Sequence, residues 1–154
     1  MINNKTLDDL TVADVRHLLV EHATVIKQHQ PMRMLLEKLI EDPRKRNVYV
    51  VDDENVLIGS VRMNAVVESL FPLSAVLEYS GLLTMESFHL VGSTVDDIMD
   101  EKPCFVSEST SLSDMARILM REKIDELPVL DGQHRVIGQI NVYEVIAAYL
   151  KTSL

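Results

Sequence analysis

The sequence has little of the chemistry that marks disulfide-rich or aromatic-rich proteins. It contains one cysteine, Cys104, no tryptophan and only 5% aromatic residues. A single cysteine excludes an internal disulfide, and its place next to the apolar pair Phe105 and Val106 predicts a small buried side chain rather than a nucleophile. Because 47% of the residues are apolar, we expect a folded protein whose core is built from aliphatic side chains.

Basic residues are also scarce. Lysine and arginine number 15 against 24 acidic residues, which gives a net charge of −9. Nucleic acids and anionic membranes are held by basic surfaces, so neither is an expected partner. No apolar run approaches the roughly 20 residues of a membrane helix, and the N-terminus lacks the pattern of a signal peptide. The sequence therefore predicts a cytoplasmic protein that does not insert into a membrane.

Patterns for catalysis and metal binding are missing as well. No Ser-His-Asp order, phosphate-binding glycine loop or pair of acids in an obvious cleft is present. The histidines lack paired metal-ligand spacing with cysteine or carboxylates. They are His17, His22, His29, His89 and His134. We therefore expect no catalytic residue, no metal site and no enzyme activity.

What the chain does contain is a hairpin followed by a helix, between Glu126 and Ile146. Two apolar runs, Leu127–Leu130 and Val136–Ile140, are separated by the turn dipeptide Asp131-Gly132, which predicts two strands. From Asn141 onward the pattern is typical of a helix. The apolar residues at helical spacing are Val142, Val145, Ile146 and Tyr149.

The same pattern occurs 79 positions earlier, in residues 47–67. The matched pairs are Val48 and Leu127, Val50 and Val129, Asp52 and Asp131, Ile58 and Ile137, Gly59 and Gly138, and Val61 and Ile140. Each copy follows a leader, a strand and a helix in the same order. These are Thr11–Val15, Ala23–Lys27 and Pro31–Glu41 in the first half, and Thr94–Ile98, Cys104–Ser107 and Ser111–Glu122 in the second. The chain therefore contains an internal repeat, with one copy in each half.

This ordered set resembles a tandem pair of cystathionine β-synthase (CBS) domains, often called a Bateman module. The likeness is carried by Val95–Met99, Glu126–Asp131 and Gly138–Ile146. It implies an α/β (α+β) fold of two pseudo-symmetric β-α-β-β-α repeats packed through their sheets. Residues 1–70 would form the first repeat and 94–154 the second. The apolar, helical segment 71–93 between them would either cover the core or form a partner surface.

The resemblance implies a non-catalytic regulatory module. It would sense an adenosine-containing nucleotide (AMP, ADP, ATP or S-adenosylmethionine) in a cleft between the repeats, with no other cofactor expected. It would form a homodimer and act on a regulated enzyme or transporter. The alternative is a ligand-free structural or interaction module that homodimerises and docks a partner protein.

The family's ligand signature is Gly, any residue, an aliphatic residue, Thr or Ser, two residues, then Asp. Gly138, Ile140, Asn141 and Glu144 occupy it here, with Asn in place of Thr and Glu in place of Asp. The resemblance implies a phosphate contact for Asn141 and a ribose contact for Glu144. The same two residues also have the spacing of a capping box, which needs no ligand.

Three further residues enter through the resemblance. Val106 and Ser107 would border the base or ribose at the end of the first strand of the second repeat. In the first repeat Arg62 takes the Thr position and Ala65 the Asp position, and an alanine cannot hold a ribose. Arg62 is then either a ligand of a phosphate or acidic partner, or a solvated, ion-paired side chain.

Overall fold

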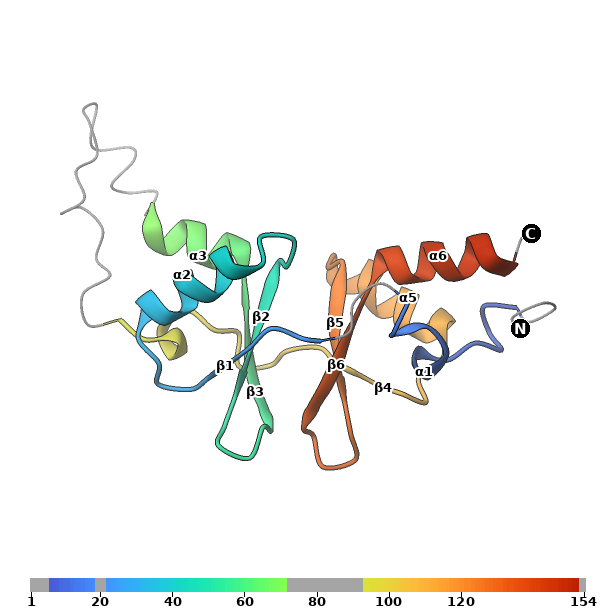
Figure 1. Ribbon diagram of the computed structural model, residues 1–154, viewed down its shortest axis with the longest axis horizontal. Helices are drawn as coiled ribbons and strands as arrows, with labels where there is room; N and C mark the ends of the chain where they lie inside the picture. Colours follow the sequence, from blue (N-terminus) through green and yellow to red (C-terminus); the bar gives the residue numbers. More distant parts are fainter. Residues whose placement is uncertain (1–5, 19–21, 72–92, 153–154) are drawn as a thin grey trace. The chain divides into compact units, whose positions relative to one another are not determined.

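The computed structural model describes residues 6–18, 22–71 and 93–152, and these fall into two compact units (Figure 1). The β1–β3 unit contains Thr24–Asp53 and Ile58–Pro103. The β4–β6 unit contains Met1–Ala23, Glu54–Leu57 and Cys104–Leu154. Each unit has one three-stranded sheet with helices packed on it. The mixed α/β fold class that the sequence predicts is thereby confirmed.

The β1–β3 unit is built around a parallel strand pair and a helical crossover. Its sheet has the order β1-β2-β3, and β1 runs parallel to β2 with Val25 opposite Tyr49. Because parallel neighbours cannot be joined by a tight turn, helix α2 connects them. The elements are β1 (Val25–Lys27), α2 (Met32–Glu41), β2 (Asn47–Val51), β3 (Leu57–Arg62), α3 (Met63–Leu70) and the 3-10 helix η2 (Val95–Asp97).

The β4–β6 unit repeats this plan. Its sheet has the order β4-β5-β6, with β4 parallel to β5 and β5 antiparallel to β6. The elements are α1 (Val12–Val15), β4 (Val106–Ser107), α5 (Leu112–Glu122), β5 (Glu126–Leu130), β6 (Val136–Asn141) and α6 (Val142–Thr152). The strands and helices therefore lie within a few residues of their predicted positions.

Helix α5 shows why these segments become helices. Ser111 caps its start by accepting a hydrogen bond from the Asp114 N–H at 3.1 Å, and Lys123 ends it in a left-handed conformation with φ 53°. Met115 is buried in the core, whereas Met120 on the opposite side of the helix is 71% exposed.

The leaders of the two halves are exchanged between the units. Leu10, Val12 and Val15 from the first half lie in the core of the β4–β6 unit, where the Leu112 N–H donates to the Leu10 carbonyl at 2.9 Å. Val95 from the second half lies in the core of the β1–β3 unit, where the Met32 N–H donates to the Ser93 carbonyl at 3.0 Å. The compact units therefore do not coincide with the predicted repeats 1–70 and 94–154. Those repeat boundaries describe similarity along the sequence and remain a prediction.

Helix α6 buries a different face from the one its apolar residues mark. Glu144 and Ala148 are fully buried, whereas Val142, Ile146 and Tyr149 are 36%, 47% and 58% exposed. The predicted helix is present, but most of its apolar stripe faces away from the core. Of the predicted segment 71–93, residues 72–92 lie outside the described part of the chain.

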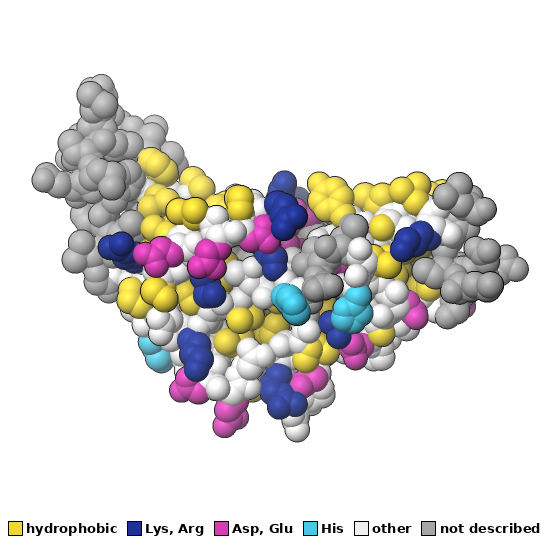
Figure 2. Space-filling view, in the orientation of Figure 1, with side chains coloured by type: hydrophobic (Ala, Val, Ile, Leu, Met, Phe, Trp, Pro, Cys, Tyr) yellow, Lys and Arg dark blue, Asp and Glu magenta, His cyan; other side chains and the backbone are white. Residues whose placement is uncertain are grey.

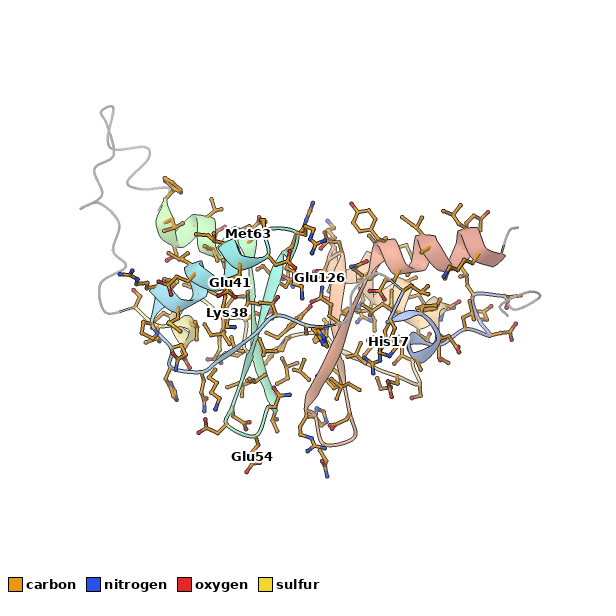
Figure 3. All side chains as sticks on the ribbon, viewed as in Figure 1. His17, Lys38, Glu41, Glu54, Met63 and Glu126 are labelled. Atoms are coloured by element: carbon orange, nitrogen blue, oxygen red, sulfur yellow. The ribbon has the colours of Figure 1, made fainter. Side chains whose placement is uncertain are left out.

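The turn between β5 and β6 is organised by the Asp131 carboxylate. It accepts hydrogen bonds from the N–H groups of Gln133 and Arg135, both at 2.9 Å, and from the Arg135 Nε at 2.8 Å. The turn between β2 and β3, with Glu54 at its tip (Figure 3), contacts the β5–β6 hairpin and belongs to the same compact unit. Here the Asn55 side chain donates to the Val136 carbonyl at 2.8 Å. Together these bonds fix the end of the hairpin.

The Asp131 contacts predict a pH-dependent stability. The hydrogen bond from the Arg135 N–H, aided by the Arg135 side chain, holds the pKa of Asp131 below its ordinary value of 3.8. A carboxyl with a depressed folded-state pKa stabilises the fold above its unfolded pKa, and this contribution is lost as pH falls through the folded pKa. Asp131→Asn should therefore lower the urea midpoint at pH 7 and lower it much less at pH 3.

Asp8→Asn, at an exposed position near the N-terminus, is the matched control. A difference between wild type and Asp131→Asn that is equally large at both pH values would contradict this account, because it would show that charge is not involved.

The leader exchange predicts where a core mutation acts. Leu10→Ala should destabilise the β4–β6 unit by about 2–5 kcal/mol, because it leaves a cavity in that core. Hydrogen exchange should accelerate in α5 and β5 and stay unchanged in α2 and β2. Leu35→Ala, in the core of the other unit, is the mirror control. Faster exchange in α2 and β2 upon Leu10→Ala would show that the first leader stabilises its own half.

Candidate functional site

The corner where β6 becomes α6 holds the predicted signature residues of the second half. The Asn141 Oδ1 accepts a hydrogen bond from the Glu144 N–H at 3.2 Å, so Asn141 caps the helix, which is one of the two contacts of a capping box. Glu144 itself is fully buried. A ribose held by this carboxylate would therefore have to reach an enclosed group, and the assignment of Glu144 to a ribose remains a prediction.

Val106 and Ser107 lie on β4, across the sheet from this corner. Val106 is buried in the core of the unit and pairs with Val129, which in turn pairs with Gly138. The Ser107 hydroxyl lies 2.9 Å from the Ser109 hydroxyl. The structure thus places Val106 and Gly138 in one row with β5 between them, and it places the Ser107 side chain in a hydroxyl cluster at the start of α5.

Arg16, which the sequence analysis missed, joins these two segments. Its Nε and Nη2 both lie 2.8 Å from the Glu108 Oε1, and its Nη1 donates to the Ile137 carbonyl at 3.2 Å. A Cβ at Gly138 would come within 2.6 Å of the Arg16 Nη1. A side chain at position 138 would therefore displace the end of the Arg16 side chain from its place over β6.

The other unit uses its glycine in the same way. A Cβ at Gly59 would come within 2.7 Å of the Met99 Sδ and within 3.0 Å of the Asp100 carbonyl oxygen. Met99 follows the second leader at the position that Arg16 holds after the first. In each unit, then, the residue directly after the exchanged leader covers the signature glycine. The position of Arg16 directly after the first leader was the sequence signal that could have identified it.

A pocket of about 260 Å³ opens next to the glycine corner of the β1–β3 unit. Its walls come from the end of β3, the first turns of α3 beyond Met63 (Figure 3), and the segment after η2. The residues that line it are Ser60, Arg62, Asn64, Ala65, Glu68, Ile98 and Asp100. Arg62 is the predicted ligand residue that the structure places here. Asp100, Ile98 and Glu68 were missed, because they lie outside the signature.

The electrostatics of this pocket are mixed. The Arg62 Nη2 lies 4.0 Å from the Asp100 Oδ2, and both side chains are about half exposed, at 46% and 47%. An exposed pair at this distance contributes little to stability, so the guanidinium can exchange partners. The backbone of Asp100 is held firmly, since it exchanges two hydrogen bonds with Ser60 at 2.8 and 3.0 Å.

Buried polar residues recur at matched strand positions of the two halves. The Gln139 amide donates to the Glu126 carboxylate at 3.1 Å, with the two residues 2% and 6% exposed. Asn47 and Ser60, which hold the equivalent positions 79 residues earlier, are each 8% exposed. Polar residues within otherwise apolar strands were the signal for these positions.

Neither a metal-binding cluster nor a membrane-spanning helix occurs in the described ranges 6–18, 22–71 and 93–152. Those ranges contain no group of three or more His, Cys, Asp or Glu side chains able to hold a metal ion. Among the same residues, no helix combines the length and apolar character needed to cross a membrane.

Comparison with known proteins identifies a family model that matches the second half of the chain. Residues 95–151 match the family model of the CBS domain. CBSX1, a chloroplastic CBS domain-containing protein of Arabidopsis thaliana, is 29% identical over 151 residues, which cover 85% of this chain and 61% of that protein. CBSX2 of the same organism is 38% identical over 60 residues, which cover 39% of this chain and 25% of that protein. The chain thus spans only part of the length of these curated relatives.

Solved structures show the same fold over nearly the whole chain. The crystal structure of CBSX2 in complex with AMP is 27% identical, with a TM-score of 0.71, and the match covers 92% of this chain and 97% of that one. A CBS domain-containing protein of Thermotoga maritima matches in fold with a TM-score of 0.73 at 24% identity, over 92% of this chain and 95% of that one. The second half of the chain thus matches the CBS-domain family model, and the chain has the fold of a tandem CBS-domain pair.

Proposed function

We propose that this chain is a non-catalytic regulatory module that binds an adenosine-containing nucleotide. The observation that carries the proposal is the pocket of about 260 Å³ at the signature corner of the β1–β3 unit. Its volume lies just below the roughly 300–1,000 Å³ of typical small-molecule sites. A nucleotide bound there would leave part of itself outside the pocket. The AMP complex of the related protein CBSX2 supports the choice of ligand class.

The pocket offers groups for the ribose and for an anionic group of a nucleotide. Ala65 replaces the carboxylate that the family signature uses for the ribose, but Glu68 and Asp100 line the same pocket and can accept from vicinal hydroxyls. Arg62 can receive an anionic group after leaving Asp100, because their ion pair is exposed and weak. The pocket therefore does not need the missing aspartate to bind a ribose.

The regulatory part of the proposal concerns a second protein. A ligand in this pocket would touch both the β3–α3 corner and the leader segment of the second half, through Ile98 and Asp100. Ligand occupancy can therefore bias the position of that leader, and an enzyme or transporter in the cytoplasm would sense the change. Whether the two repeats also enclose a cleft between them remains a prediction.

Binding is tested by thermal unfolding with AMP, ADP, ATP and S-adenosylmethionine. A ligand at 100 times its dissociation constant should stabilise the folded chain by about 2.7 kcal/mol. For a chain of this size that corresponds to an upward shift of the midpoint by about 5–10 °C. Asp100→Asn should reduce the shift if this carboxylate holds the ribose, and Arg33→Gln, on the exposed side of α2, is the control. The absence of a shift with every adenosine ligand would refute the proposal.

A second candidate function, a homodimerising interaction module, is favoured by the exposed face of α6. Its side chains form an apolar row along the helix, visible as a line of hydrophobic residues in Figure 2. They are Val142, Tyr143, Ile146, Tyr149 and Leu150. The exposed residues Met63 and Val67 of α3, and Phe71 directly after it, hold the equivalent positions of Val142, Ile146 and Leu150. Because the row recurs in both repeats, a second copy of the chain is the occupant that fits it.

Light scattering tests this second candidate. The wild-type chain should have the mass of a dimer, and the double variant Ile146→Glu with Tyr149→Glu should be monomeric, because two carboxylates would be buried without partners in the interface. Lys151→Glu, on the same helix, should leave the mass unchanged. A monomeric wild-type chain, or a double variant that is still dimeric, would rule out α6 as the dimer surface.

A further inference from the structure

Arg16 occupies a position that no signature residue explains. It comes from the first leader, yet it lies on the sheet of the β4–β6 unit, where its guanidinium covers Gly138 and contacts the Ile137 carbonyl. Its other contact is Glu108, the residue directly after Ser107. The side chain therefore bridges the two segments in which the family resemblance places ligand contacts, the end of β4 and the glycine of β6.

The present partner of Arg16 is a carboxylate that can be replaced. The Arg16 side chain is only 13% exposed, whereas the Glu108 side chain is 46% exposed. The Glu108 side chain can therefore rotate into solvent at little cost in free energy. The more buried Arg16 guanidinium cannot leave its place over β6 as easily. The three contacts described above occupy three of the five N–H groups of a guanidinium. A phosphate in the place of Glu108 would accept two parallel hydrogen bonds from the same planar group.

The equivalent position in the other unit is uncharged. Met99 covers Gly59 there as Arg16 covers Gly138, and the pocket beside it contains Glu68 and Asp100 against the single cation Arg62. A phosphate near that pocket meets the Arg62 guanidinium together with two carboxylates. The two glycine corners are therefore similar in backbone but differ in the residue over the glycine, which is cationic in one unit and uncharged in the other. This difference predicts a different preference for anions.

We propose that Arg16 is an anion-binding residue of the β4–β6 unit and that it receives the phosphate group of a nucleotide, with Glu108 holding the guanidinium in place while no ligand is bound. The nucleotide part of this proposal rests on the proposed function. The anion part stands independently of it, because it concerns any phosphate group.

Arg16→Met is the sharpest variant, because it gives the β4–β6 unit the residue that the other unit already has over its glycine. Packing over Gly138 is then retained while the charge is removed. Arg16→Lys keeps a charge without the planar pair of donors, and Glu108→Gln removes the competing carboxylate. Arg33→Met, at a side chain that is 87% exposed on α2, is the matched control. Far-UV circular dichroism and the unfolding midpoint without ligand confirm that each variant is folded.

Three probes are titrated by calorimetry and thermal shift: AMP, adenosine and inorganic pyrophosphate. Arg16→Met should weaken AMP binding to the β4–β6 unit by about ten- to a hundredfold, the range that hydrogen bonds to a charged group supply. It should leave AMP binding in the β1–β3 pocket and adenosine binding unchanged. It should also abolish the stabilisation by pyrophosphate. Arg16→Lys should retain part of the AMP affinity, Glu108→Gln should increase pyrophosphate affinity, and Arg33→Met should resemble wild type.

The proposal is overturned if Arg16→Met weakens AMP and adenosine equally, if it weakens neither, or if pyrophosphate stabilises it as much as wild type. If no adenosine ligand binds the wild-type chain, the proposed function fails, and pyrophosphate still decides the role of Arg16. A pyrophosphate shift that is lost in Arg16→Met then supports the anion site, whereas no shift in the wild type refutes it.

Discussion

The packing of each leader on the sheet of the other half is the constraint on which the rest of the structure depends. The hydrophobic side chains of the leader complete the core, and its next residue, Arg16 or Met99, covers the signature glycine. A larger residue at Gly59 or Gly138 would collide with that side chain. Neither sheet therefore has a complete core face unless the other half of the sequence supplies it, which ties the two repeats together.

The same exchange builds the candidate sites from both halves. The pocket of the β1–β3 unit takes Ile98 and Asp100 from beyond the repeat that supplies Arg62 and Ala65. The corner of the β4–β6 unit takes Arg16 from the first leader. In the proposed function, a ligand in the β1–β3 pocket thus contacts a leader segment as well as a helix start, and the proposal on Arg16 extends this to the other corner. A ligand shifts a conformational equilibrium only by as much as its contacts favour one conformation over the other.

Much of the fold was predictable because local sequence patterns determine its strands, turns and helices. Alternating apolar runs and the Asp131-Gly132 turn predicted the β5–β6 hairpin, and the 79-residue repeat predicted its copy. The exchange of the leaders was not predictable, since periodicity shows which residues are buried but not which sheet buries them. The face of α6 is a similar case. Buried Glu144 and exposed Ile146 reverse what hydrophobicity alone indicates, because tertiary packing decides the orientation of a helix.

The candidate site was predicted only in part. The signature led to Arg62, Asn141 and Glu144, whereas Arg16 and Asp100 lie outside it and reach the corners through the exchange. The most direct test of the account is an amide NMR titration of the wild-type chain with AMP. The account predicts chemical-shift changes at the amides of Ser60, Asp100 and the first turn of α3, and at those of Arg16 and Gly138. Shifts confined to other regions, or no shifts at all, would contradict it.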